Sequence, residues 1–221
     1  MFTVFRSASF PFTLALVAVC LAGPVHGQTS TDLTLTSEYA ARGMALDRRA
    51  AVQVRVEHDF DSGWYGGVFA SPVALAGQRH AQLTAYGGHA QRLSSTLSWD
   101  AGVTSSAYLR DSSLNYHEVY AGLGLDRASA RLFYSPAYYG EERSVYLDLN
   151  GGYPLTDKVS LALHGGLLKP SGERRLIDVR LALSTDIGDF NLQAGWQIKG
   201  EAYLPGSSRA RALTASVSRR F

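Results

Sequence analysis

Residues 51–70 read AVQVRVEHDFDSGWYGGVFA, and this stretch decides how the rest of the chain is interpreted. From Val52 to Phe60, apolar residues alternate with polar and charged ones, which predicts a β-strand with one apolar and one charged face. Residues 61–63 carry the Asp, Ser and Gly of a tight turn, and Trp64 opens a return strand. Phe60 and Trp64 then share the apolar face on either side of the turn. A membrane barrel needs this pattern, because lipid covers one face, water covers the other, and aromatic residues gather at the bilayer edge.

The same alternation recurs and predicts an all-β chain of twelve strands. The predicted strands cover residues 32–43, 51–60, 64–70, 82–90, 95–106, 115–125, 130–137, 144–153, 159–168, 176–186, 190–199 and 209–221. Long connections follow the odd strands, as at residues 44–49, 74–81 and 107–114, and mostly short ones follow the even strands. Outer-membrane barrels have short periplasmic turns and longer external loops. The pattern therefore predicts a transmembrane, antiparallel, up-and-down β-barrel of about twelve strands, closed because an open sheet edge is excluded in lipid.

A soluble β-sandwich or a lipocalin-like barrel is the alternative fold. It does not explain why charged residues recur on one face of most strands while the other face is nearly free of charge. Three histidines, His58, His89 and His117, fall on the apolar face. A position at a strand end or a slip in register would explain them.

The first 27 residues have the features of a secretory signal peptide, with cleavage expected before Gln28. An uncleaved membrane anchor and a lipoprotein modified at Cys20 are the alternatives. The single cysteine lies in this segment, so residues 28–221, read as one barrel domain, contain no disulfide and no cysteine-ligated metal site. The formal net charge of +2 gives no reason to expect a nucleic-acid partner.

Aromatic residues of the apolar face collect at the end with the short turns and predict a girdle at one membrane interface. The predicted girdle consists of Phe60, Trp64, Trp99, Tyr153, Phe190 and Phe221. Tyr39 and Trp196 are candidates for the opposite interface. The terminal Phe221 is also a signal that the barrel-assembly machinery reads, although Arg219 interrupts the alternation just before it. We therefore expect contact with outer-membrane lipids and with that machinery, in a Gram-negative bacterium.

Several motifs resemble those of the TorF-type porins, a proteobacterial family of unknown function. They are residues 36–39 (TSEY) with 42–43 (RG), 51–53 (AVQ), 63–71 (GWYGGVFAS), 115–120 (NYHEVY), 134–136 (YSP) and 147–154. The sequence departs from the family at residues 44–46, where Met-Ala-Leu stands in place of polar residues. The resemblance covers most of the chain after the signal peptide. It implies an outer-membrane barrel and no particular substrate.

The opposite, inward face is rich in charge and predicts a water-filled pore for small polar or ionic solutes. The candidate pore-lining residues are Glu38, Arg42, Arg55, Glu57, Asp100, Glu118, Asp148, Asp178, Arg180 and Lys199, with Asp59, Arg131 and Arg220 on the same face. Neither sign of charge dominates this set. A plugged or structural barrel, in which the charges pair to stiffen the wall, remains open as an alternative.

A lipid-modifying hydrolase is the third alternative. Ser105 and His117 share the outward face on neighbouring predicted strands, but no acidic residue follows that face nearby to orient the histidine. No metal-ligand spacing, phosphate-binding loop or cofactor motif appears. We therefore expect a channel without catalytic activity and without a cofactor.

Overall fold

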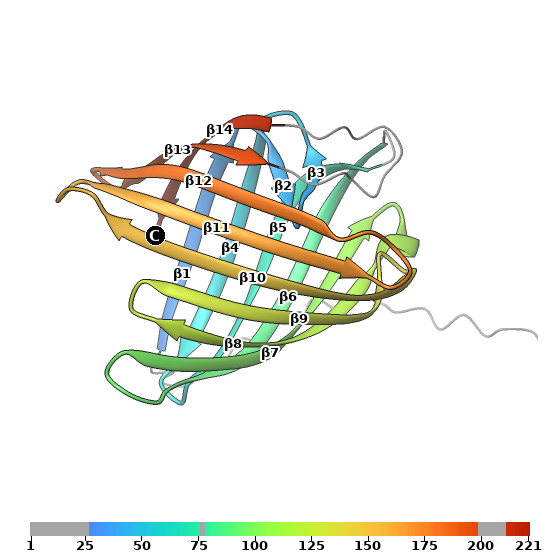
Figure 1. Ribbon diagram of the computed structural model, residues 1–221, viewed down its shortest axis with the longest axis horizontal. Coiled ribbons are helices and arrows are strands. Elements are labelled where there is room, and N and C mark those ends of the chain that lie inside the picture. Colours follow the sequence, from blue (N-terminus) through green and yellow to red (C-terminus); the bar gives the residue numbers. More distant parts are fainter. Residues whose placement is uncertain (1–26, 76–77, 199–210) are drawn as a thin grey trace, which may run out of the picture.

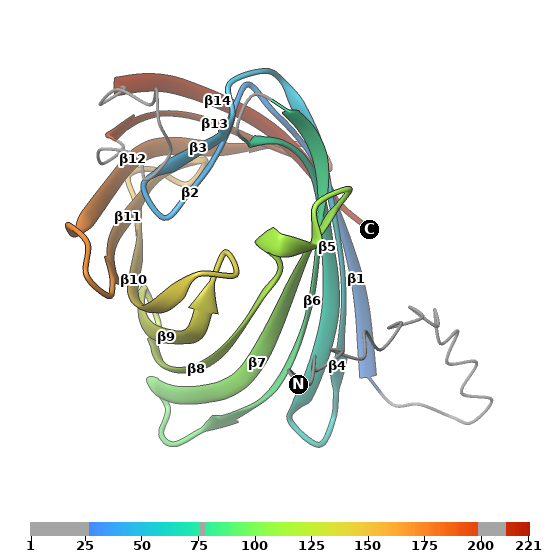
Figure 2. The same cartoon turned by 90° about the vertical axis from the view of Figure 1, so that its right-hand side faces the viewer.

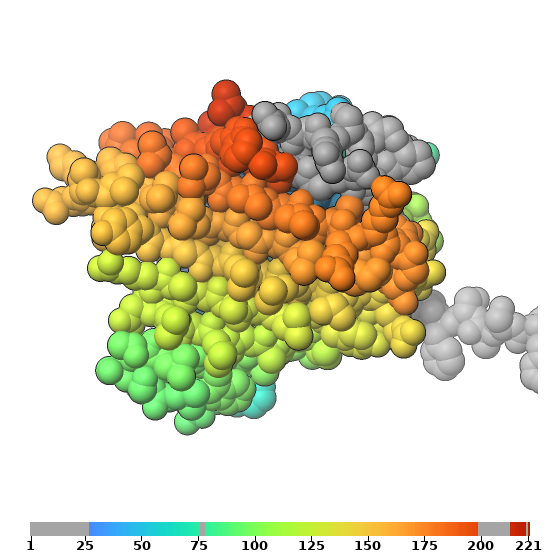
Figure 3. All heavy atoms as spheres, viewed as in Figure 1, coloured from blue at the N-terminus to red at the C-terminus, as the bar shows by residue number. Residues whose placement is uncertain are grey.

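The computed structural model describes residues 27–75, 78–198 and 211–221, and within them twelve antiparallel strands close into a barrel (Figures 1 and 3). In the order around the wall they are β1 (Gly27–Thr36), β14 (Arg211–Arg220), β13 (Phe190–Ile198), β12 (Leu176–Ile187), β11 (Val159–Pro170), β10 (Glu142–Pro154), β9 (Ala128–Tyr138), β8 (Tyr116–Leu125), β7 (Leu97–Leu109), β6 (Gln78–Arg92), β5 (Trp64–Leu75) and β4 (Ala51–Phe60). The fold predicted from sequence, including the number of strands, is confirmed. No helix in the described residues is long and apolar enough to cross a bilayer.

Each strand of the wall turns apolar side chains outward and polar ones inward, as its period of two predicts. On β12, Ile177, Val179 and Leu181 are exposed on the outside, while Asp178 is buried and Arg180 is half-buried on the inside. The hairpin that starts at residue 51 behaves in the same way, with Val52 and Val54 exposed. Large exposed apolar side chains recur on eleven of the twelve strands of the wall, with β6 as the exception, which gives most of the barrel the exterior that hydrocarbon requires.

The prediction of residues 32–43 as one strand is wrong in its second half. β1 ends at Thr36, and the chain then forms a separate hairpin of β2 (Tyr39–Ala41) and β3 (Met44–Asp47), where sequence predicted a loop from residue 44. Its two turn residues, Arg42 (φ 53°) and Gly43 (φ 79°), both have left-handed backbones, which is the geometry of a type I′ turn. Figure 2 looks into the barrel and shows this hairpin inside the ring of strands. The lumen is therefore partly filled by the chain itself.

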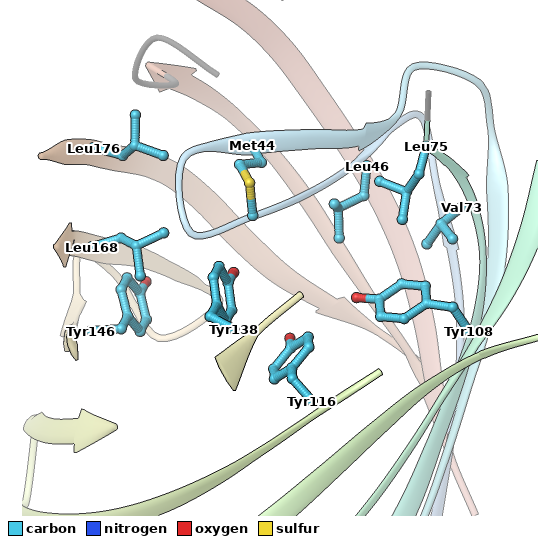
Figure 4. Close-up of a cluster of buried hydrophobic side chains, with 10 residues drawn as sticks. All are labelled: Met44, Leu46, Val73, Leu75, Tyr108, Tyr116, Tyr138, Tyr146, Leu168 and Leu176. Atoms are coloured by element: carbon cyan, nitrogen blue, oxygen red, sulfur yellow. The ribbon is translucent and has the colours of Figure 1, made fainter. Parts of the chain in front are cut away.

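An apolar core lies inside one end of the barrel, around the β2–β3 hairpin (Figure 4). Met44 and Leu46 of the hairpin are each 2% exposed. They pack with inward side chains of the wall, which are Val73, Leu75, Tyr108, Tyr116, Tyr138, Tyr146, Leu168 and Leu176. This is the end where the longer connections lie. We call this set of ten residues the mouth cluster.

The mouth cluster also explains two further errors in the predicted strand limits. The loop predicted at residues 74–81 is mostly strand, because β5 and β6 stay paired as far as Leu75 and Gln78. The loop predicted at residues 107–114 likewise begins too early, since β7 continues to Leu109. At the ends of β5 and β7 both faces are apolar, so the alternation that marks a half-buried strand is lost.

The wall closes where β1 pairs with β14. Five positions are paired, from Asp32 with Arg220 to Thr36 with Ser216, compared with ten between β1 and β4. Two backbone hydrogen bonds between Thr31 and Phe221, of 2.9 and 3.3 Å, extend this seam at the short-turn end. The predicted signal peptide, residues 1–27, lies outside the described residues apart from Gly27, with which β1 begins.

Candidate functional site

The candidate site is a cavity of about 700 Å³ in the barrel lumen. Eight of the predicted pore-lining residues border it, namely Arg42, Arg55, Glu57, Asp100, Glu118, Asp148, Asp178 and Arg180. Asp59 and Arg131 border it as well, whereas Glu38 does not. Lys199 and the side chain of Arg220 lie outside what the structure describes. The lumen therefore collects charges from strands that are far apart in sequence, and their role toward a solute stays a prediction.

The tip of the β2–β3 hairpin is clamped to the wall by Arg42. Its guanidinium donates two hydrogen bonds to the carboxylate of Glu118 on β8, one of them from Nη2 to Oε2 over 2.6 Å. The same guanidinium lies against the rings of Phe133, Tyr138 and Tyr146, at 4.8–5.4 Å from their centroids. The Glu118 side chain is 2% exposed, so this is a buried ion pair with aromatic support.

A second group of polar contacts lies closer to the short-turn end. The hydroxyl of Tyr65 donates to Asp100 at 3.1 Å and lies 2.6 Å from the hydroxyl of Tyr120. Arg131 donates to the same carboxylate oxygen of Asp100, with Nη2 2.6 Å from Oδ2. These residues come from β5, β7, β8 and β9, so the network spans five consecutive strands on the inside of the wall and passes over β6.

A third group surrounds His164 on β11. Its Nδ1 lies 3.2 Å from Asp148 and 3.0 Å from the amide oxygen of Asn150, both on β10. Its Nε2 contacts the carboxylate of Asp178 on β12, which is 1% exposed. One histidine thus bridges two carboxylates on either side of it along the wall. Sequence alone did not single out His164, although its inward position in the alternation could have identified it.

Two arginines of the lumen are not committed to a carboxylate. Arg55 lies over the ring of Phe69 at 5.7 Å, and Arg180 donates to the amide oxygen of Gln193. Neither forms an ion pair within the residues that the structure describes. Their positive charge is therefore not neutralised by an adjacent carboxylate among the described residues, in contrast to the charge of Arg42 and Arg131.

The lumen also contains aromatic rings, which were not among the pore-lining residues predicted from sequence. Tyr65, Phe69, Tyr86, Tyr120, Phe133 and Tyr146 all border the cavity. Tyr86 donates to Glu57 at 2.6 Å, so these rings also orient the charges beside them. Their inward place in the alternation was readable from the sequence, and Tyr39, expected on the outside, is among them because it belongs to the inner hairpin.

The predicted girdle aromatics lie on the outside of the wall near the short turns, and two histidines join them. His58 packs on Phe60 with ring centroids 4.3 Å apart, and His89 packs on Trp64 at 5.1 Å. His58 lies 2.7 Å from the hydroxyl of Thr29, and His89 lies 3.2 Å from the carbonyl of Ser62. A position at a strand end, with a local hydrogen bond, thus accounts for both, and no register slip is needed.

Outside the wall, a groove of about 500 Å³ crosses β6 to β9. Ser105 and His117 both line it, and they are directly opposite each other in the β7–β8 ladder. The residue Glu118 also borders the groove, but Arg42 holds its carboxylate on the lumen side of the wall. No group of three or more His, Cys, Asp or Glu among the described residues could hold a metal ion.

Comparison with known proteins gives a family and a fold. Residues 22–210 match the family Gcw_chp, described as "Bacterial protein of unknown function". No curated protein matches significantly. A solved structure called "KdgM porin" is similar with a TM-score of 0.56 at 13% identity, covering 87% of this chain and 98% of that one. One called "NanC porin structure in rhombohedral crystal form" is similar with a TM-score of 0.59 at 9% identity, covering 85% and 97%.

Proposed function

The chain belongs to the Gcw_chp family of bacterial proteins of unknown function, and we propose that it forms an outer-membrane channel through which small polar or ionic solutes diffuse passively. The fold it shares with solved porins supports a barrel with a lumen. The proposal assigns the chain no catalytic activity. The likeness to TorF-type porins remains a prediction from motifs.

The observation that carries the proposal is the contrast between the two faces of the wall. The exterior carries large exposed apolar side chains on eleven of the twelve strands, while a cavity of about 700 Å³ inside is bordered by charged, amide and hydroxyl side chains. Ionised groups are costly to bury away from water, since each must be paired or solvated. A lumen that keeps Arg55 and Arg180 without a carboxylate partner among the described residues is best explained by access of water and solutes.

The outer membrane is the location that fits these features. The girdle aromatics and the short turns mark the periplasmic end by analogy with known barrels. We propose that outer-membrane lipids cover the exterior and that the assembly machinery recognises the last strand with Phe221. One neighbour is titled as a porin "in complex with disordered oligogalacturonate". That ligand is a property of the neighbour, and the solute proposed here is defined only as small and polar or ionic.

A plugged barrel is the second candidate, and the mouth cluster favours it. Met44 and Leu46 fill part of the lumen at the end with the longer connections. A solute would have to pass between the β2–β3 hairpin and the wall. The channel is therefore proposed to be narrow, with the hairpin as its constriction.

Conductance in planar bilayers separates the two candidates. The purified protein should give discrete, small current steps, and a variant in which residues 39–47 are replaced by a short Gly-Ser linker should give larger ones. Steps only from the variant would favour the plugged barrel. No steps from either would contradict a channel. Heat-modifiable migration on an SDS gel, together with recovery in the outer-membrane fraction, checks that each protein is a folded barrel in its membrane.

A further inference from the structure

The exterior groove across β6 to β9 differs from the rest of the outer wall. One side is a row of Val103, Val119 and Tyr134, which are exposed and directly paired across β7, β8 and β9, and the small residues Ala85 and Gly87 line its end on β6. Pairing in the ladders places Ala85 opposite Ser105, and Gly87 opposite Val103. The groove therefore runs across the strands, between the row of Val103 and Val119 and the row of Ser105 and His117, and has a volume of about 500 Å³.

One edge of the groove is polar. His117 is exposed, and Ser105 lies directly opposite it on the next strand. Neither side chain forms a hydrogen bond with any residue that the structure describes. His58 and His89 differ in this respect, because each has a hydrogen-bond partner and an aromatic ring beside it. An outward histidine and serine without a hydrogen-bond partner among the described residues have donors free for a group from outside the protein.

Position along the strand places this edge near a membrane interface. His117 is the second residue of β8, and the connection before it belongs to the end with the longer loops. In a barrel with short periplasmic turns, that end is the outer leaflet. The polar pair therefore lies where lipid headgroups and ester groups are found, and the valines of the groove lie deeper in the hydrocarbon.

We propose that this groove binds a phosphate-bearing acyl lipid of the outer leaflet, with an acyl chain along the row of Val103, Val119 and Tyr134 and the phosphate at His117 and Ser105. The proposal rests on the membrane location given above. Both side chains offer hydrogen-bond donors, which a phosphate accepts. The groove itself is almost entirely apolar, as an acyl chain requires.

Binding rather than hydrolysis follows from what surrounds the pair. A serine nucleophile needs a base within hydrogen-bond reach and a third group that orients that base. No hydrogen bond joins Ser105 to His117 in the described structure, and the nearby carboxylate of Glu118 faces the lumen in its ion pair with Arg42. The pair has the chemistry of a headgroup anchor.

Native mass spectrometry of the purified full chain tests the proposal, with dimyristoylphosphatidylglycerol as the anionic probe and the matching phosphatidylcholine as its zwitterionic counterpart. We expect the parent protein to retain the anionic phosphatidylglycerol in preference to the phosphatidylcholine. His117→Ala should weaken retention of the anionic lipid about tenfold, since a hydrogen bond to a charged group contributes on that scale. Val103→Trp should fill the groove and abolish retention of both lipids. Val179→Trp, at an equally outward position on β12, is the matched control and should change nothing.

Equal retention by the parent protein, His117→Ala and Val103→Trp would overturn the proposal. Dimers formed through this face and lost in Val103→Trp would overturn it too, because a second copy would then be the occupant. Release of fatty acid that disappears in Ser105→Ala would replace binding with catalysis. These outcomes are read on barrels that pass the heat-modifiability check. A protein that fails that check contradicts the proposed membrane location instead.

Discussion

Arg42 and Glu118 lie 76 residues apart in the chain and meet inside the lumen, where the tip of the β2–β3 hairpin is held against β8 by two parallel hydrogen bonds. Three aromatic rings enclose the guanidinium on its other sides. Sequence predicts Arg42 and Glu118 as two separate pore-lining charges, whereas in the structure their ion pair fixes the hairpin to the wall. The β2–β3 hairpin that it holds occupies part of the lumen.

Breaking the Arg42–Glu118 ion pair should widen the proposed channel and lower the stability of the barrel. In Glu118→Gln the buried guanidinium loses its counter-charge, a change that costs about 3–5 kcal/mol when a buried pair is broken. We expect larger or more variable single-channel currents and a lower temperature for loss of the compact gel band. Arg219→Gln, which removes an exposed pair with Asp189, is the control and should have little effect. Unchanged currents from Glu118→Gln would mean that the hairpin is not the constriction.

Ion selectivity should depend on the arginines that lack a carboxylate partner. Reversing Arg55 and Arg180 to Glu should shift the preference toward cations, because their charges are the least neutralised by neighbours. Reversal potentials under a salt gradient measure this shift. Arg42 is unsuitable for such a test, even though its inward position invites it, since Arg42→Glu would bring two buried carboxylates together. If the double variant kept the parental reversal potential, these arginines would not line the conducting path.

The two faces of β4 should differ in their tolerance of charge. Val54→Arg places a charge on the apolar exterior, at a cost of about 2–4 kcal/mol near the bilayer midplane. Gln53→Arg points into the lumen and loses only a hydrogen bond to Ser71 of 3.2 Å. The yield of heat-modifiable protein should therefore fall much further in Val54→Arg. Similar yields would show that Val54 does not face lipid.

Two adjacent glycines on β11 should respond in opposite ways to an added methyl group. A Cβ on Gly166 would lie 2.5 Å from Asp178 Oδ1 and against the hydroxyl of Tyr146, and both of those side chains are buried. Gly166→Ala should therefore lower thermal stability by about 1–3 kcal/mol through overpacking. Gly165 has no atom within 4 Å of such a Cβ, and Gly165→Ala should be neutral or slightly stabilising. Equal effects on the melting of the gel band would contradict the packing described here.

Sequence predicted the wall well and the interior poorly, for a physical reason. Where one face meets water and the other lipid, as from Val52 to Phe60, the period of two identifies the strand and its faces. At the mouth cluster both faces are apolar, so the ends of β5 and β7 lost their signal. The β2–β3 hairpin left one trace, Arg-Gly between short alternating runs at residues 39–47, which is typical of a two-residue turn. The partners of Arg42 and His164 could not be predicted, because contacts across the lumen or between strands depend on register rather than local pattern.

The seam between β1 and β14 makes the ring depend on the last residues of the chain. Eleven of the twelve neighbour pairs in the wall join strands that the chain reaches one after another, apart from the inner hairpin, while this pair alone joins its two extremes. A protein shortened by residues 216–221 would lose every position paired across the seam and four of the nine positions that pair β13 with β14, while the other strand pairs would stay complete. It would be an open sheet with two unpaired edges, each of which would expose N–H and C=O groups to hydrocarbon. At the proposed membrane location, a chain that lacks the paired part of β14 should therefore fail to insert as a closed barrel.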